Sequence, residues 1–179
     1  EKQQQIFQQV TASATFPCVV KSANQGSSIG VSVVVSPDFE TFRNAVNKSF
    51  FCRLITLQEW NDLSFPAKVE WVRTLTDIRE GIGIPVKISS KIIFHPEELL
   101  SNLNQLFSEL EPQVLIESVE GESEVLIEAF IQGKEFSCIV IENVDGTPVA
   151  LPPTEIRKGS ELFDYRSKYL PGLSRKITP

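Results

Sequence analysis

The chain has 179 residues, of which 41% are hydrophobic, which is enough for one good core but hardly for two large independent domains. Its net charge is −6 at pH 7 and its lysines and arginines are dispersed, so no basic stripe is available to neutralise a nucleic-acid backbone. No apolar stretch approaches the roughly 20 residues that a membrane-spanning helix needs, and no signal-peptide pattern opens the chain. We therefore expect a soluble, cytoplasmic unit that binds neither nucleic acid nor membrane.

The three cysteines, Cys18, Cys52 and Cys138, are an odd number at wide and irregular spacings. These spacings match neither a paired metal-ligand motif nor a disulfide framework. Because two of the cysteines lie inside apolar runs, we expect buried thiols in a reduced setting rather than a bridge or a reactive thiol. The chain has no methionine and stops at a strand-like or turn-like point, so we interpret it as an excised piece of a longer protein.

The first part of the chain predicts a surface helix, a hairpin and a second helix. Residues 1–14 are polar with apolar residues at helical spacing, which indicates a short helix. Residues 16–21 and 31–35 are apolar and β-branched, and the Gly/Ser-rich segment 24–30 between them predicts a hairpin loop. Ser36 is then the expected N-cap of a helix, followed by proline and an acid. Its apolar face is expected to contain Phe39, Phe42, Val46 and Phe50.

The middle segment, residues 52–120, predicts helices of its own, with a short strand over 85–88 between them. His95 is expected at a helix start and not at a metal site, because the chain has no second histidine. The residues expected to face inward are Trp71, Val72, Leu75 and Ile78 on the helix after Pro66, and Leu99, Leu103, Leu106 and Leu110 on the helix after Pro96.

The last third is rich in strand-forming residues. Strands are predicted over 125–131, 136–141 and 149–156, with an Asp145-Gly146 turn and then a charged and aromatic loop over 157–169. Strands linked mostly by hairpins, with helices interspersed rather than strictly alternating, indicate an α+β fold with an antiparallel sheet flanked by helices.

A lysine at a strand end directly before a flexible loop suits an anionic ligand. Lys21 provides a point charge, and glycines in the following loop permit backbone angles that turn N–H groups inward. This is not the phosphate loop that opens a helix, because here the lysine precedes the loop and a strand follows it. Taken alone, such a hairpin is more often a simple turn.

Two carboxylates, Glu128 and Glu135, flank the connection between two predicted strands. A carboxylate can accept a hydrogen bond from the amino group of adenine, and a second one suits ribose hydroxyls. Taken alone, two solvated glutamates at a strand edge are the simpler interpretation.

Several short motifs in the same order are more specific than any one of them. The motifs are 17–23 (Pro-Cys-Val-Val-Lys-Ser-Ala), 26–31 (Gly-Ser-Ser-Ile-Gly-Val), 125–136, 153–156 (Pro-Thr-Glu-Ile) and 163–169 (Phe-Asp-Tyr-Arg-Ser-Lys-Tyr). Together they resemble the ATP-grasp module of D-alanine-D-alanine ligases over 16–50 and 121–179. The resemblance implies an ATP-grasp nucleotide-binding subdomain made of 1–51 and 121–179, with 52–120 as an inserted helix and strand segment of unknown role.

The resemblance also implies roles for individual residues. Lys21 resembles the lysine that contacts ATP phosphates, and Gly26, Ser27 and Ser28 resemble the mobile loop that folds over them. Glu128 resembles the acceptor for the adenine amino group. By the same resemblance, the backbone at Phe130 and Ile131 would contact adenine and Glu135 would bind ribose. Lys168 would contact the terminal phosphate, and Tyr169 would hold the closed loop against Ser27. By this resemblance Lys168, Tyr169 and Ser27 are the catalytic candidates.

The sequence Val-Leu-Ile-Glu occurs twice, at 114–117 and at 125–128. Glu117 is five residues from the next candidate carboxylate, Glu122, whereas Glu128 and Glu135 are seven apart, as in the family, so Glu128 is preferred. The chain departs from the family at Ser22, where proline is usual, at Ala129, where lysine is common, and at Phe163, where tyrosine is usual.

The inserted segment weakly echoes the first hairpin, with a proline-led strand followed by a helix that begins with proline and an acid. A partial duplication is one explanation, and ordinary strand-helix order is the one that we favour from sequence. Lys87 and Lys91 have no glycine loop beside them, so they are not assigned to phosphate.

In ligases of this type, ATP phosphorylates a substrate carboxylate and the amine of a second amino acid attacks the acylphosphate. The resemblance therefore implies a D-alanine-D-alanine ligase of peptidoglycan precursor synthesis, with ATP and D-alanine as partners and an oligomeric state, such as a homodimer, left open. The Mg²⁺ ligands of the family lie downstream, in Arg-x-Asp and Glu-x-Asn stretches, so this chain is expected to hold no metal ligand and to be inactive by itself. The alternative is a non-catalytic, ATP-grasp-like nucleotide-binding or assembly module.

Overall fold

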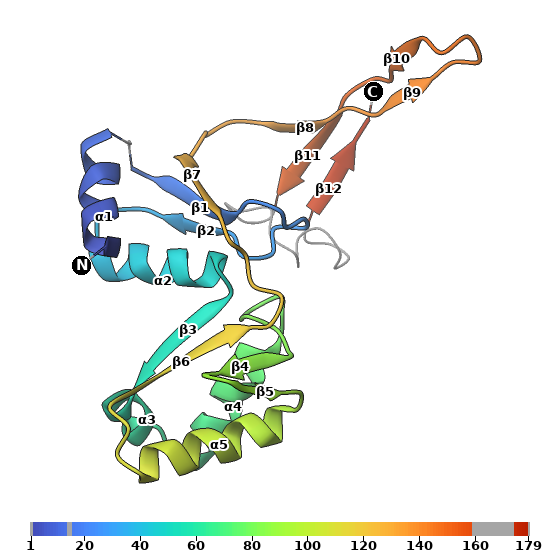
Figure 1. Cartoon of the computed structure of the whole chain (residues 1–179). Helices are drawn as coiled ribbons and strands as arrows, with labels where there is room; N and C mark the ends of the chain where they lie inside the picture. Colours follow the sequence, from blue (N-terminus) through green and yellow to red (C-terminus); the bar gives the residue numbers. More distant parts are fainter. Residues whose placement is uncertain (1, 14–15, 159–173, 179) are drawn as a thin grey trace. The chain divides into compact units, whose positions relative to one another are not determined.

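The computed structural model describes residues 2–13, 16–158 and 174–178 (Figure 1). It divides into two compact units, Glu1–Phe130 and Ile131–Pro179. Helices and antiparallel sheets are both present, which confirms the α+β prediction. None of the described helices is both long enough and apolar enough to cross a membrane.

The first sheet contains β2 (Ser32–Val34), β1 (Cys18–Ser22) and β7 (Val125–Ala129), in that order and all antiparallel. Helix α2 (Phe39–Ser49) lies along one face of it, and α1 (Lys2–Ser13) lies beside α2 (Figure 1). The Phe7 ring of α1 contacts the rings of Phe39 and Phe42 at centroid distances of 5.5 and 5.2 Å. The buried core between helix and sheet consists of Cys18, Val20, Val34, Phe42, Ala45 and Val46.

Helix α2 begins two residues later than the sequence suggested. Its N-cap is Asp38 and not Ser36, because the Asp38 carboxylate accepts hydrogen bonds from the Thr41 backbone N–H at 2.8 Å and from the Thr41 hydroxyl at 2.6 Å. Those two bonds lower the pKa of Asp38. A carboxylate at this position also suits the positive end of the helix dipole.

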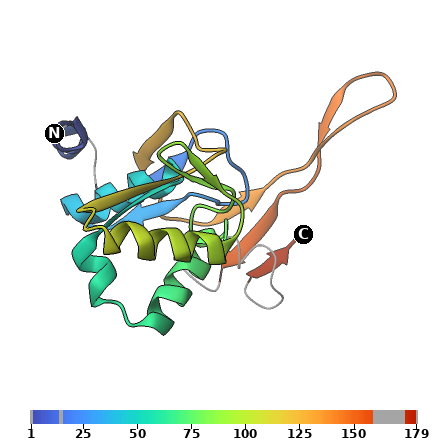
Figure 2. The ribbon, with the colours of Figure 1, turned by 60° about the horizontal axis from the view of Figure 1, so that its bottom comes forward.

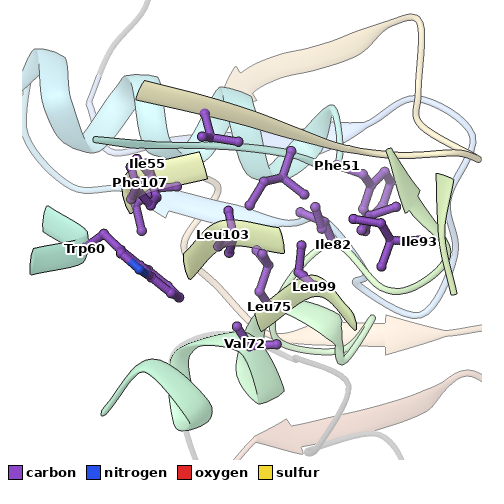
Figure 3. Close-up of a cluster of buried hydrophobic side chains, with 13 residues drawn as sticks. Phe51, Ile55, Trp60, Val72, Leu75, Ile82, Ile93, Leu99, Leu103 and Phe107 are labelled. Carbon is purple, nitrogen blue, oxygen red and sulfur yellow. The ribbon is translucent and has the colours of Figure 1, made fainter. Parts of the chain in front are cut away.

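The second sheet has the order β3-β6-β4-β5 and is antiparallel throughout. Its strands are β3 (Cys52–Thr56), β6 (Gln113–Ser118), β4 (Val86–Ile88) and β5 (Lys91–Ile93). Helices α3 (Leu57–Asp62), α4 (Phe65–Thr76) and α5 (Pro96–Ser108) lie along one face of this sheet (Figure 2). Side chains from these strands and helices meet in one hydrophobic cluster around Leu103 and Trp60 (Figure 3).

Two residues expected in this core are outside it. Ile78 and Leu110 are 42% and 74% exposed, because α4 ends at Thr76 and α5 at Ser108, before either residue is reached. The other expected positions are buried or packed against the core, and Phe107 joins them although the sequence did not single it out. His95 occupies the N-cap of α5, as expected.

The second unit contains β8 (Glu135–Ser137), β9 (Val140–Glu142), β10 (Pro148–Ala150), β11 (Thr154–Lys158) and β12 (Ser174–Ile177). They form a sheet of order β12-β11-β8 and a separate β9-β10 hairpin. The continuous strands expected over 136–141 and 149–156 are therefore wrong, since each is divided. Pro152 and Pro153 have no N–H to donate to a ladder, which accounts for the break before β11. The expected turn at Asp145-Gly146 is present, with Gly146 at φ +81°.

The cysteines are all free, and they differ in exposure. Cys18 is buried and Cys52 is partly buried, and burial raises the pKa of both thiols, that of Cys52 to about 11 with a smaller contribution from the nearby Glu117 carboxylate. Cys138 is exposed, so the expected buried thiol is wrong there. The apolar run around it is itself largely exposed, with Phe136 and Ile139 at 55% and 62%.

Candidate functional site

The alternation of side chains along β1 separates core residues from site residues. Cys18, Val20 and Ser22 are buried, and Lys21 points to the opposite face of the sheet. On the neighbouring strand β7, Ile127 packs against the same core, which directs Glu128 to the face that carries Lys21. Two ionisable side chains from distant parts of the chain thus share one exposed sheet face.

The strand register brings Lys21 and Glu128 into contact. Lys21 lies opposite Leu126 and Glu128 lies opposite Val19, so the two are diagonal neighbours. The distance from Lys21 Nζ to Glu128 Oε1 is 2.6 Å, although the residues are 107 positions apart in sequence. The side chains are 33% and 50% exposed. An ion pair this exposed contributes only about 0 to 1 kcal/mol, so a ligand can separate it at little cost.

The loop between β1 and β2 has an unusual backbone. Ser27 and Ser28 have φ values of 56° and 60°, and Gly30 follows at 71°. The Ile29 N–H donates to the Gly26 carbonyl at 3.0 Å, which closes a tight turn around the two serines. Left-handed backbone at consecutive positions is uncommon outside glycine and is found where surrounding structure holds it in place.

A buried hydroxyl network holds the base of this loop. The Ser22 hydroxyl donates to the Ser49 carbonyl at 2.7 Å, and the Ser49 hydroxyl lies 2.7 Å from the Gly30 carbonyl and 2.9 Å from the Ala45 carbonyl. Ser22 and Ser49 are 5% and 0% exposed, so these bonds replace water at both ends of the loop. A proline at position 22 could not donate in this way.

Ser49 was not among the residues expected at the site. A signal for it exists, because Ser49 follows Phe42 and Val46 on the buried face of α2, where an apolar residue is the expectation. A hydroxyl on the apolar face of a helix near its end indicates a specific buried hydrogen bond.

The loop is also tied to the segment that precedes β7. The Ala23 N–H donates to the Glu124 carbonyl at 3.2 Å, and the Asn24 side-chain amide donates to the Glu122 carboxylate at 3.0 Å. The end of β7 is fixed in a similar way, because the Phe130 N–H donates to the Pro17 carbonyl at 3.0 Å. A ligand contact from the Phe130 backbone would therefore come from its carbonyl oxygen.

The remaining predicted site residues belong to the second unit or lie outside the described residues. Ile131 is 88% exposed and Glu135 opens β8, and both belong to the second unit. Lys168 and Tyr169 lie outside the described residues. The competing Glu117 lies in the second sheet, 3.5 Å from Lys87. Within the described part of the chain, no group of three or more His, Cys, Asp or Glu side chains could hold a metal ion.

Comparison with known proteins gives a family match over most of the chain. The family described as "D-ala D-ala ligase C-terminus" matches residues 1–53 and 102–178. Residues 54–101, which fall within the predicted insertion, are not matched. The predicted bounds of the insertion, 52–120, stay a prediction.

Curated relatives carry the name D-alanine–D-alanine ligase. The protein of Fervidobacterium nodosum is 32% identical over 57% of this chain and 31% of its own length. That of Carboxydothermus hydrogenoformans is 31% identical over 65% of this chain and 36% of its own length. That of Leptospira interrogans serovar Lai is 48% identical over a shorter match, 34% of this chain and 18% of its own length. The chain thus spans about a third of the length of the first two relatives.

Replacing Gly30 by alanine tests the anchored base of the loop. At φ +71° an added Cβ would be strained, and it would lie 2.3 Å from the Ser22 hydroxyl oxygen. We expect Gly30→Ala to lower the free energy of unfolding by about 1 to 3 kcal/mol in urea denaturation. The matched control is Gly26→Ala, where an added Cβ meets nothing within 4 Å, with an expected change within about 0.5 kcal/mol. Equal effects of the two substitutions would contradict this view of the loop.

Proposed function

The chain belongs to the family of the D-alanine–D-alanine ligase carboxyl-terminal domain, and we propose that it forms the ATP-binding part of an ATP-dependent D-alanine–D-alanine ligase. The observation that carries the proposal is the pair formed by Lys21 and Glu128 on one exposed sheet face, beside the anchored Gly/Ser loop. A cation suited to phosphate and an acceptor suited to an amino group are thereby neighbours on a fixed scaffold.

In this proposal ATP replaces the ion pair. The Lys21 ammonium would bind phosphate oxygens, and the Glu128 carboxylate would accept a hydrogen bond from the adenine amino group, with the Phe130 carbonyl beside it. Charge-assisted hydrogen bonds contribute about 1.5 to 3 kcal/mol each. The exposed pair that they replace contributes about 0 to 1 kcal/mol, so the exchange favours the bound nucleotide.

The other roles in the proposal rest on family resemblance. Residues Gly26 to Ser28 would cover the phosphates, and Ile131 and Glu135 would contact adenine and ribose. Lys168 would reach the terminal phosphate, and Tyr169 would hold the closed loop through Ser27.

The proposed reaction joins two D-alanine molecules in peptidoglycan precursor synthesis in the cytoplasm. ATP phosphorylates the carboxylate of the first, and the amine of the second attacks the acylphosphate and releases phosphate. Positive groups around the transferring phosphoryl stabilise its charge, which is the task of Lys21 and Lys168 in this proposal. Mg²⁺ supplies further charge neutralisation in such reactions, but the described residues offer no set of three metal ligands, so no step is assigned to it in this chain. The chain by itself is proposed to hold nucleotide without turnover.

Calorimetric titration with a non-hydrolysable ATP analogue and Mg²⁺ tests the nucleotide site. Lys21→Ala and Glu128→Ala are each expected to weaken binding at least about tenfold, because each removes one charge-assisted contact. Lys91→Ala and Glu98→Ala are the matched controls, since they break a similar surface ion pair of 3.2 Å between β5 and α5 and should leave the affinity unchanged. Tight binding that neither Lys21→Ala nor Glu128→Ala affects would refute the site.

Turnover by the full-length protein tests the reaction. Given ATP, Mg²⁺ and D-alanine, it should release phosphate and form the dipeptide. Phosphate release only with another amino acid would indicate a different carboxylate-amine ligase. Nucleotide binding without turnover on any amino acid would instead support the non-catalytic, ATP-grasp-like binding or assembly module.

A further inference from the structure

The second sheet repeats the arrangement of the first. In the first, the β1-β2 hairpin is followed by α2, and β7 pairs with β1 to give the order β2-β1-β7. In the second, the β4-β5 hairpin is followed by α5, and β6 pairs with β4 to give the order β5-β4-β6. The two Val-Leu-Ile-Glu segments lie in β7 and β6, at the same place in each arrangement.

The pairing register agrees residue by residue. Val19 lies opposite Glu128, and Lys87 lies opposite Glu117. Phe130, two residues after Glu128, donates its N–H to the carbonyl of the proline that precedes β1. Val119, two residues after Glu117, donates its N–H to the carbonyl of the proline that precedes β4, also at 3.0 Å. This agreement favours the partial duplication over ordinary strand-helix order, which was the preferred explanation from sequence.

The two copies differ where phosphate would bind. In the register, Lys21 corresponds to Ser89, and the long loop of the first hairpin is reduced to Ser89-Ser90 between the paired residues Ile88 and Lys91. The second copy therefore has neither the lysine nor the glycine loop.

The second copy has a cavity beside its glutamate. The cavity has a volume of about 310 Å³, and its lining includes Lys87, Glu117, Val119 and Glu122. Glu117 and Val119 correspond to Glu128 and Phe130, so the cavity covers the position that corresponds to the proposed adenine contacts. All of its lining residues belong to the first compact unit.

The charges of the side chains that line the cavity indicate which class of ligand it would bind. Two carboxylates and one ammonium give a net negative lining, which disfavours phosphates and favours a ligand that donates hydrogen bonds through amino and hydroxyl groups. The Lys87–Glu117 pair is about two-fifths exposed on each side, so it opens easily. A volume near the lower end of the range for small-molecule sites, roughly 300 to 1,000 Å³, suits a nucleoside better than a nucleoside triphosphate.

We infer that residues 84–122, together with Phe50 and Cys52, form a second binding site, specific for a neutral nucleoside-sized ligand with an amino group and hydroxyls. The choice of an adenine ring as the probe rests on the proposed function, through the role given to Glu128. The repeat and the cavity are independent of that choice.

Calorimetric titration of adenosine into this chain tests the inference. The proteins compared are the wild type and variants that carry Glu117→Gln, Glu122→Gln or Glu128→Gln, each verified as folded by circular dichroism. Adenosine should bind saturably to Glu128→Gln, and at least about tenfold more weakly when Glu117→Gln or Glu122→Gln is added to that variant, since Glu128 of the first site is then absent from every protein compared. In Glu128→Gln, ATP should bind this site more weakly than adenosine.

Two results would overturn the second site. One is the absence of saturable adenosine binding to Glu128→Gln, and the other is binding that neither Glu117→Gln nor Glu122→Gln weakens. Failure of the first site would be detected in a different titration. It would appear as tight binding of the ATP analogue that neither Lys21→Ala nor Glu128→Ala weakens.

Discussion

The antiparallel register between β1 and β7 is the constraint on which the candidate site depends. It directs Cys18 and Val20 into the core under α2 and, by the same alternation, directs Lys21 and Glu128 to the opposite face. A shift of one residue in either strand would bring the charged residue of that strand into the core and its apolar residues into water. The hydrophobic burial that stabilises the sheet therefore also fixes the relative position of the two charged groups, without any need for the ion pair itself to be strong.

The loop beside this pair is held at its base and open at its tip. Ser22, Ser49 and Gly30 form a buried hydrogen-bonded junction between β1, α2 and the loop end, whereas an added Cβ at Gly26 would meet no neighbour. A loop with fixed ends and a tip with unusual backbone angles is suited to closing over a ligand, because its tip can move while β1 and β2 keep their pairing. The repeat in the second sheet lacks both this loop and the lysine that corresponds to Lys21, but keeps the glutamate and the bonded proline carbonyl, which indicates that the sheet pairing and the phosphate loop are separable features.

Sequence patterns predicted the elements that carry strong local signals. The β1-β2 hairpin, α2, α4 and α5 follow from periodicity, proline positions and a Gly/Ser loop, and the order of short motifs made Lys21 and Glu128 candidates for the site. The ion pair between them could not be derived, because it depends on a register between strands 107 positions apart. The strands β3, β5 and β6 were missed because short strands in a segment rich in helix signals have no distinctive period. Ser49 was missed because a serine in a helix can be exposed or buried, and the sequence does not show which backbone carbonyls its hydroxyl would contact.

The central claim is that nucleotide binds on the exposed face of the first sheet, between Lys21 and Glu128 and under the loop. Amide hydrogen exchange of this chain, with and without a non-hydrolysable ATP analogue and Mg²⁺, tests this claim most directly. With the analogue bound, we expect slower exchange in residues 23–31 and at the end of β7 up to Phe130, with no change in α5. Unchanged exchange over 23–31 in the presence of saturating analogue, or protection confined to the second sheet, would contradict it.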